Sequence, residues 1–206
     1  DHLILSIKRN KVKDIKQVIP KFYLSQCKQC GKCGEVCKFN AIAAVKGHYP
    51  IFVETPCNGC QACIISCPYD AIKKGERKVG EIFNGKKGNL NLVSAQIVPN
   101  YAISVFVVEK ELEYTKTKQD DYDYIIIDTA TGTHCNVIEA LNKCDIIFAV
   151  TEPTPLGAHD LELILKLLKI LNKNAKVVLN RSDIGNKKLI ETLVKKYNTK
   201  ITAEIP

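Results

Sequence analysis

The 206-residue chain contains no methionine, and none of its apolar runs approaches the length of a membrane span. A membrane-crossing helix needs about 20 consecutive apolar residues, so the sequence predicts no transmembrane segment. We also expect no signal peptide ahead of the cysteines. Because no initiator methionine is present and the chain opens within an apolar stretch at residues 2–5, we expect a fragment of a longer protein.

Eight of the ten cysteines fall into two ladders with the same spacing, C-x2-C-x2-C-x3-C, between residues 27 and 67. Bacterial-type ferredoxins hold [4Fe–4S] clusters with this spacing. Two residues between thiolates let one tight loop direct three sulfur atoms at one cluster, while the fourth cysteine caps the other cluster. The predicted ligands are Cys27, Cys30, Cys33 and Cys67 for cluster I, and Cys57, Cys60, Cys63 and Cys37 for cluster II.

The chain around the ladders repeats with a period of 30 residues, so that Phe22 corresponds to Phe52 and Ile42 to Ile72. Such a repeat indicates a duplicated unit whose halves share one core. One departure is that a lysine stands in the first ladder where the second has Pro68. A disulfide framework and a structural zinc site are alternative interpretations. The first conflicts with the missing signal peptide, and zinc sites usually separate two C-x2-C pairs.

The formal net charge is +8, and lysines and arginines concentrate at residues 8–38 and 73–87. A basic surface near a cluster could dock an acidic redox partner, which the sequence does not name. It could equally be a solvated surface that offsets the anionic clusters. Aromatic residues are not interleaved with the basic ones, which argues against nucleic-acid binding. Oxidation-sensitive clusters without a signal peptide predict a cytoplasmic location.

Residues 21–82 are predicted to form the ferredoxin-like unit, with a hairpin at residues 41–45 and 48–53 and a polar connector at residues 84–91. From about residue 92 the pattern changes to alternating strands and helices, which predicts a parallel sheet covered on both faces. The expected strands are residues 101–108, 122–128, 145–151, 176–180 and 200–205, and the expected helices are residues 135–143, 157–171 and 186–197.

Polar residues follow several of these strands, where parallel sheets bind ligands. Asp128 ends one apolar strand and Gly132 follows in the turn, so an aspartate that holds magnesium and a glycine amide near a phosphate are candidates. A plain turn or helix cap is the alternative interpretation. Residues 80–87 nearly match the phosphate loop G-x4-G-K-[ST], but a lysine replaces the required hydroxyl.

At this point the sequence resembles the MinD/Mrp-type P-loop ATPases that carry an inserted two-cluster ferredoxin domain. The resemblance rests on the two ladders, on residues 127–135, on residues 150–161 and on residues 178–181. It implies an α/β fold, an incomplete parallel-sheet P-loop NTPase-like domain with an inserted α+β bacterial-ferredoxin-like domain. The implied boundaries are residues 1–20 for the first piece of the ATPase-like domain, 21–82 for the ferredoxin-like domain, and 83–206 for the remainder.

The resemblance also implies ATP and magnesium as ligands of the full-length protein. Asp128 would be the magnesium-associated aspartate, Gly132 would approach the terminal phosphate, and Asn180, Arg181 and the backbone near Pro206 would contact adenine. Relatives act as dimers, so a homodimer is implied. The family's phosphate loop should lie upstream of Asp1, so we expect this chain alone not to hydrolyse ATP.

Three functions remain open at this stage. The first is an ATPase whose nucleotide state and cluster redox state influence each other, and the second is a simple electron carrier with a docking domain. The third is an iron–sulfur cluster carrier, although carriers of the Mrp type use a C-terminal C-x-x-C, which is absent after Cys67. Of the other two cysteines, Cys144 is expected in the core and Cys135 at the start of a helix.

Overall fold

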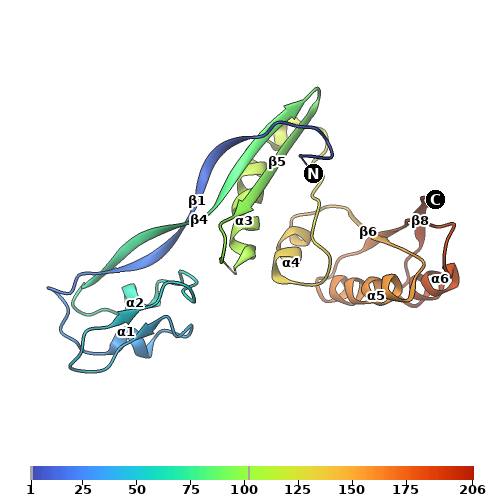
Figure 1. Ribbon diagram of the computed structural model, residues 1–206. Helices are drawn as coiled ribbons and strands as arrows, with labels where there is room; N and C mark the ends of the chain where they lie inside the picture. Colours follow the sequence, from blue (N-terminus) through green and yellow to red (C-terminus); the bar gives the residue numbers. More distant parts are fainter. Residues whose placement is uncertain (1, 102) are drawn as a thin grey trace. The chain divides into compact units, whose positions relative to one another are not determined.

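The computed structural model describes residues 2–101 and 103–206, which form two compact units divided between Thr115 and Lys116 (Figure 1). The first unit contains both cysteine ladders, and the second contains a parallel sheet. Among the described residues, no helix combines the length and the apolar character that a membrane crossing requires.

A three-stranded antiparallel sheet with the order β1-β4-β5 forms the framework of the first unit. Its strands are β1 (Asn10–Phe22), β4 (Ile72–Lys87) and β5 (Leu90–Ile97). Phe22 lies opposite Ile72 in the register, so the β1–β4 ribbon holds both ends of residues 23–71 next to each other. Figure 1 shows this cysteine-rich segment at one end of the long ribbon and β5 at the other.

Residues 84–91 are not the polar connector that we expected. They belong to a hairpin in which β4 and β5 pair up to Lys87 opposite Leu90, with Gly88 in the turn at a φ of 58°. A positive φ favours glycine, which explains the residue found there. Residues 10–20, placed with the ATPase-like domain by the sequence-based boundaries, lie in β1 of the first unit.

Helix α3 (Ser104–Lys116) stands where we expected a strand at residues 101–108, so that prediction was wrong. Residues 109–113 are Glu-Lys-Glu-Leu-Glu, all strong helix formers, and they extend a helix that begins among β-branched residues. One apolar side of the helix packs on the sheet, and tertiary packing then decides the local structure. The buried core between them consists of Ile15, Val79, Ile82 and Val107.

Short elements form the cysteine-rich segment: α1 (Lys32–Glu35), β2 (Ile42–Ala43), β3 (Ile51–Phe52) and α2 (Ala62–Ile65). The antiparallel pairing of β2 with β3 confirms the predicted hairpin, although its strands are shorter than expected. The rings of Phe22 and Phe52, which correspond in the 30-residue repeat, pack with their centroids 5.8 Å apart. The two halves of the repeat therefore share one core, which also buries Ile42 and Ile72.

The second unit alternates helices and parallel strands, in the sheet order β6-β7-β8. After a 3-10 turn, η1 (Gln119–Asp121), its elements are α4 (Cys135–Asn142), β6 (Ile147–Thr151), α5 (Pro155–Ile170), β7 (Ala175–Leu179), α6 (Lys187–Lys196) and β8 (Ile201–Glu204). These confirm the predicted helices and the last three predicted strands. The start of α5 is fixed by Thr154, whose hydroxyl accepts the Gly157 amide, and by proline in the first turn.

Two expectations for this unit are wrong. Residues 122–128 form no strand: β6 pairs with β7 alone, and Tyr124 and Ile126 are 86% and 91% exposed. Without a neighbouring strand, the backbone of this apolar run gains no ladder hydrogen bonds. The described sheet also buries only one face, because Ile147 and Ala149 pack with α5 and α6 while Phe148 and Val150 remain exposed.

Candidate metal centre

Two cavities in the cysteine-rich segment are each lined by ladder cysteines and open to solvent. Counting the solvent space at their mouths, cavity I spans about 390 Å³ and cavity II about 370 Å³. The cysteines that line them are Cys27, Cys30, Cys33 and Cys67 in cavity I, and Cys57, Cys60, Cys63 and Cys37 in cavity II. Each cavity thus takes three thiols from one ladder and the fourth from the other.

The backbone turns that gather these thiols occur at corresponding positions of the two ladders. Each ladder has left-handed residues two positions and four positions after its first cysteine, and a third after its last cysteine. The pairs are Gln29 and Gly59, Gly31 and Gln61, and Asn40 and Asp70, with φ between 52° and 82°. Such residues curl the chain tightly, so three successive thiols face one cavity. The fourth cysteine follows the short helix and faces the other cavity.

At the position two residues after the first cysteine, only the second ladder requires glycine. A Cβ atom on Gly59 would lie 2.7 Å from the carbonyl oxygen of Val18, so the loop presses against β1 at this position. The corresponding residue of the first ladder, Gln29, carries a full side chain at a φ of 55°. The second ladder is therefore packed more closely against the sheet.

The donor set fits [4Fe–4S] clusters. Backbone amides of Gln29 and Ala41 donate to the sulfur atoms of Cys27 and Cys37 at 3.4 and 3.3 Å, as suits thiolate ligands. Burial, reinforced by the nearby Cys57 and Cys60, raises the pKa of the Cys63 thiol to about 11, so a bound cation is needed to hold it deprotonated. Among the described residues, no three Cys, His, Asp or Glu side chains converge as a single ion requires.

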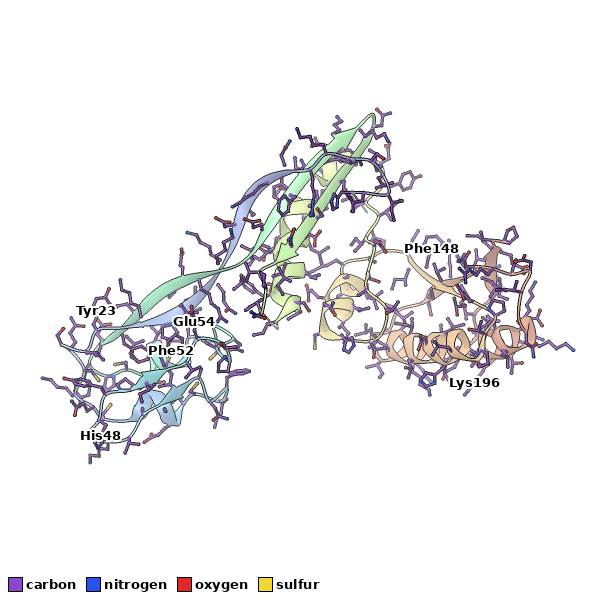
Figure 2. The ribbon with its side chains drawn as sticks, viewed as in Figure 1. Tyr23, His48, Phe52, Glu54, Phe148 and Lys196 are labelled. Carbon is purple, nitrogen blue, oxygen red and sulfur yellow. The ribbon has the colours of Figure 1, made fainter. Side chains whose placement is uncertain are left out.

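The two cavities differ in charge. Lys28, Lys32 and His48 line cavity I, whereas the described residues that line cavity II carry no ionisable side chain other than cysteine. Figure 2 shows His48 and Glu54 at separate places on the surface of the cysteine-rich segment. Of the basic residues that the sequence placed near the clusters, Lys28 and Lys32 line cavity I.

Two residues beside cavity II were missed in the sequence. Arg77, on β4, donates to the carbonyl oxygens of Glu54 and Cys57, and Gln17, on β1, donates to that of Asn58 at 2.8 Å. A signal was present, since Arg77 is one of only three arginines among 30 basic residues. Arginine rather than lysine suits a position that must bridge several oxygen atoms.

The predicted nucleotide residues of the second unit are brought together only in part. Asn180 and Arg181 follow β7. The backbone amide of Asn180 donates to the Thr151 carbonyl at the end of β6. The backbone amide of Ser182 donates to the carbonyl of Ile205, which precedes Pro206. The carboxyl ends of the three parallel strands therefore meet at these residues. Asp128 and Gly132 lie in the exposed irregular segment before α4, where Gly132 has a φ of 93°.

Comparison with known proteins decides the nature of the cysteine-rich segment. Residues 26–72 match the family described as the 4Fe-4S dicluster domain. They form a ferredoxin-type dicluster domain. The match supports [4Fe–4S] clusters as the cofactors, and its limits fall close to the paired ends of β1 and β4.

Two proteins of Methanocaldococcus jannaschii resemble longer parts of the chain. Uncharacterized protein MJ0579 is 37% identical over 114 residues, which cover 55% of this chain and 42% of that protein. Uncharacterized protein MJ0578 is 32% identical over 160 residues, which cover 78% of this chain and 55% of that protein. The chain thus spans about half the length of these relatives, whose similarity extends beyond the dicluster domain.

Proposed function

We propose that this protein transfers electrons through two [4Fe–4S] clusters held in cavities I and II. The supporting observation is that each cavity collects four thiols, three from one ladder and one from the other. Cys67 would complete cluster I and Cys37 would complete cluster II. A cysteine thiolate on each of the four irons is the ligand set of such a cluster.

The clusters would supply one-electron redox chemistry. The protein would supply the ligands, limit contact of the clusters with water and leave an edge at which electrons can enter or leave. The apolar linings, with Ile42 and Ile64 at cavity II and Ile72 at cavity I, limit contact with water. The amides that donate to Cys27 and Cys37 stabilise negative charge on those sulfur atoms. Cys60 is exposed, so cavity II offers an edge by which electrons could enter or leave.

The crossed ligand set is tested with cysteine variants of the anaerobically prepared protein. Wild type is expected to contain two clusters by iron and sulfide determination and by electron paramagnetic resonance of the reduced protein. Cys67→Ser should disturb the same cluster as Cys30→Ser, although these residues belong to different ladders, and Cys37→Ser should disturb the same cluster as Cys60→Ser.

Cys135→Ser is the matched control, because Cys135 lies in the second unit, outside both ladders. It should leave both clusters intact. If Cys67→Ser instead altered the signal that Cys60→Ser alters, each ladder would hold its own cluster and the crossed assignment would fail. Absence of iron and sulfide from the wild-type protein would refute the proposed function itself.

A second candidate is that nucleotide binding is coupled to this electron transfer, as the resemblance to MinD/Mrp-type ATPases implies. The observation that favours it is the meeting of Asn180, Arg181 and the end of β8 at the carboxyl edge of the parallel sheet. Ligands bind at this edge in open α/β sheets. Asn180, Arg181 and the backbone near Pro206 would contact adenine, Asp128 would hold magnesium, and Gly132 would approach phosphate.

This candidate is tested by ATP turnover of the anaerobically prepared intact protein, with its clusters first oxidised and then reduced. A rate that changes with the redox state supports coupling, and Asn180→Ala should then weaken ATP binding. A rate that is indifferent to redox state would separate the two activities. No binding and no turnover in either state would leave the simple electron carrier.

A further inference from the structure

One cation of the first unit is built into the loop of the second ladder. The Arg77 guanidinium donates to the carbonyl oxygens of Glu54 and Cys57, which lie just before and at the first thiol of that ladder. Its Nε and Nη2 also donate to the Gln17 side-chain oxygen at 2.9 and 2.7 Å. The positive charge is thereby fixed beside a residue that lines cavity II.

Two neighbours determine the position of this guanidinium. Gln17 is only 3% exposed, and its amide nitrogen bonds the Asn58 carbonyl of the same loop at 2.8 Å. The Tyr101 ring is the second neighbour, with the guanidinium carbon over it and 5.1 Å from its centroid. Because both groups restrict the side chain, little conformational freedom remains to be lost when it bonds the loop.

The first ladder shows no such arrangement. The carbonyl groups that correspond by the 30-residue repeat belong to Leu24, Cys27 and Lys28, and within the described residues no side chain is seen bonded to them. The cations at cavity I are Lys28 and Lys32, which are both exposed. Solvent screens exposed charges strongly, whereas the part-buried Arg77 is screened less.

We propose that Arg77, positioned by Gln17, raises the reduction potential of cluster II without a comparable effect on cluster I. The inference rests on the proposed function, since it requires both clusters. Reduction adds one electron to a cluster and so makes it more negative, with no bond formed or broken. A fixed positive charge at the ligand loop stabilises the reduced form more than the oxidised form. Arg77 would thus separate the two potentials through its charge, and Gln17 is the positioning residue that holds it.

The test is an anaerobic potentiometric titration with dithionite, followed by electron paramagnetic resonance, of wild type and Arg77→Gln. The variant should shift one of the two midpoint potentials to a more negative value and leave the other in place. Arg77→Lys keeps the charge, so its midpoint potential should stay close to that of the wild type. The matched control Lys28→Gln removes an exposed cation at cavity I and should cause a smaller change. Cys30→Ser identifies the cluster that moves, because it alters or removes cluster I.

Gln17→Glu guards against poor folding of Arg77→Gln. It keeps an oxygen acceptor for the guanidinium, loses the amide donor to the Asn58 carbonyl and partly neutralises the Arg77 charge, so the same midpoint potential should fall while Arg77 still bonds the Cys57 loop. A purely structural role for Arg77 would lower the cluster content and leave both potentials unchanged. Unchanged potentials in Arg77→Gln and Gln17→Glu with full iron content would overturn the inference and leave the proposed function standing. A wild type without clusters would refute the proposed function first.

Discussion

The two cysteine ladders have identical spacing but different surroundings. In the second ladder Cys57 and Cys63 are buried and Cys60 is exposed, the lining of cavity II carries no charge besides its thiols, and the loop is bonded from β1 and β4. In the first ladder all four cysteines are half-exposed, and lysines and a histidine line cavity I. The repeat therefore reproduces the arrangement of the thiols, while the lysines within the first ladder and the bonds from the flanking strands to the second ladder make the two cavities unlike.

This difference distinguishes the binding of a cluster by its thiolates from the adjustment of its reduction potential. Ligation needs only local spacing and a few left-handed turns, and a duplicated sequence copies both. Tuning depends on charge, burial and hydrogen bonds around the sulfur atoms. At the second ladder those features include Gln17 and Arg77, which lie 60 residues apart in the flanking strands; among the residues that the structure describes, they have no counterpart bonded to the first ladder.

The largest expected effect comes from breaking what the two halves share. Phe22→Ala and Phe52→Ala should each lower the free energy of unfolding by about 2–3 kcal/mol, since each removes a large part of the same half-buried aromatic contact. The concentration of the denaturant guanidinium chloride at which the cluster absorbance is lost should fall similarly in both variants. The double variant should lose less than the sum, because the partners touch. Additive losses would show that the halves are stabilised independently.

A smaller effect is expected where the ladders differ in packing. Gly59→Ala places a methyl group against the Val18 carbonyl at a left-handed φ and should cost about 1–2 kcal/mol. Gln29→Ala, its counterpart in the first ladder, should cost less than about 0.5 kcal/mol. Guanidinium-induced bleaching compares them directly. Equal losses would mean that the second ladder is not packed more tightly than the first.

The effect of the positive charge at cavity I can be tested by removing a lysine there and adding one at cavity II. Lys32→Ala removes a cation there, and Ala62→Lys adds one at the corresponding position of the second ladder. Oxidation of the reduced protein by the anionic reagent ferricyanide should slow about 2–5-fold in Lys32→Ala at low salt, since a basic surface attracts anions. Ala62→Lys should speed it, and both effects should vanish near 1 M salt. Oxidation rates that do not depend on salt concentration would exclude electrostatic steering at cavity I.

The smallest effect is expected far from the cysteines, in the second unit. Hydrogen bonds from Lys196 and Tyr197 hold the pKa of Glu162 at about 2, below its usual value (Figure 2 labels Lys196). A lowered carboxyl pKa contributes stability above the usual pKa, and this is lost only as pH falls toward the lowered value. Glu162→Gln should therefore slightly lower the thermal midpoint by the same amount between about pH 6 and pH 9. Both cluster potentials should stay unchanged, and a shift in either would show that the second unit influences the clusters.

The sequence predicted the grouping of thiols that the cavities display because the spacing and the turns are local. It also predicted α4 to β8, since those segments have clear helical or strand periodicity. It could not show that Gln17 and Arg77 meet at the Cys57 loop, because β1 and β4 are brought together only by the fold. The register with Ile15 opposite Gly80 and Gln17 opposite Arg77 follows from pairing across the whole cysteine-rich segment.

The errors have a common physical cause. β-branched runs at residues 101–108 and 122–128 have high strand propensity, but propensity is expressed only where a neighbouring strand is available. The first run packs as a helix on the β1-β4-β5 sheet, and the second lies beside no described strand. The glycines of residues 84–91 likewise suggested a connector, whereas the chain uses one of them to turn a hairpin.

The pairing of Phe22 with Ile72 has a consequence for how the dicluster domain can be gained, lost or moved. Because its two ends lie one strand spacing apart, the domain can be removed and replaced by a short turn without separating β1 from β4. The same two strands could accept another module of similar end spacing. The dicluster domain could therefore be exchanged as one unit between β1 and β4. Gln17 and Arg77 would stay behind in these strands.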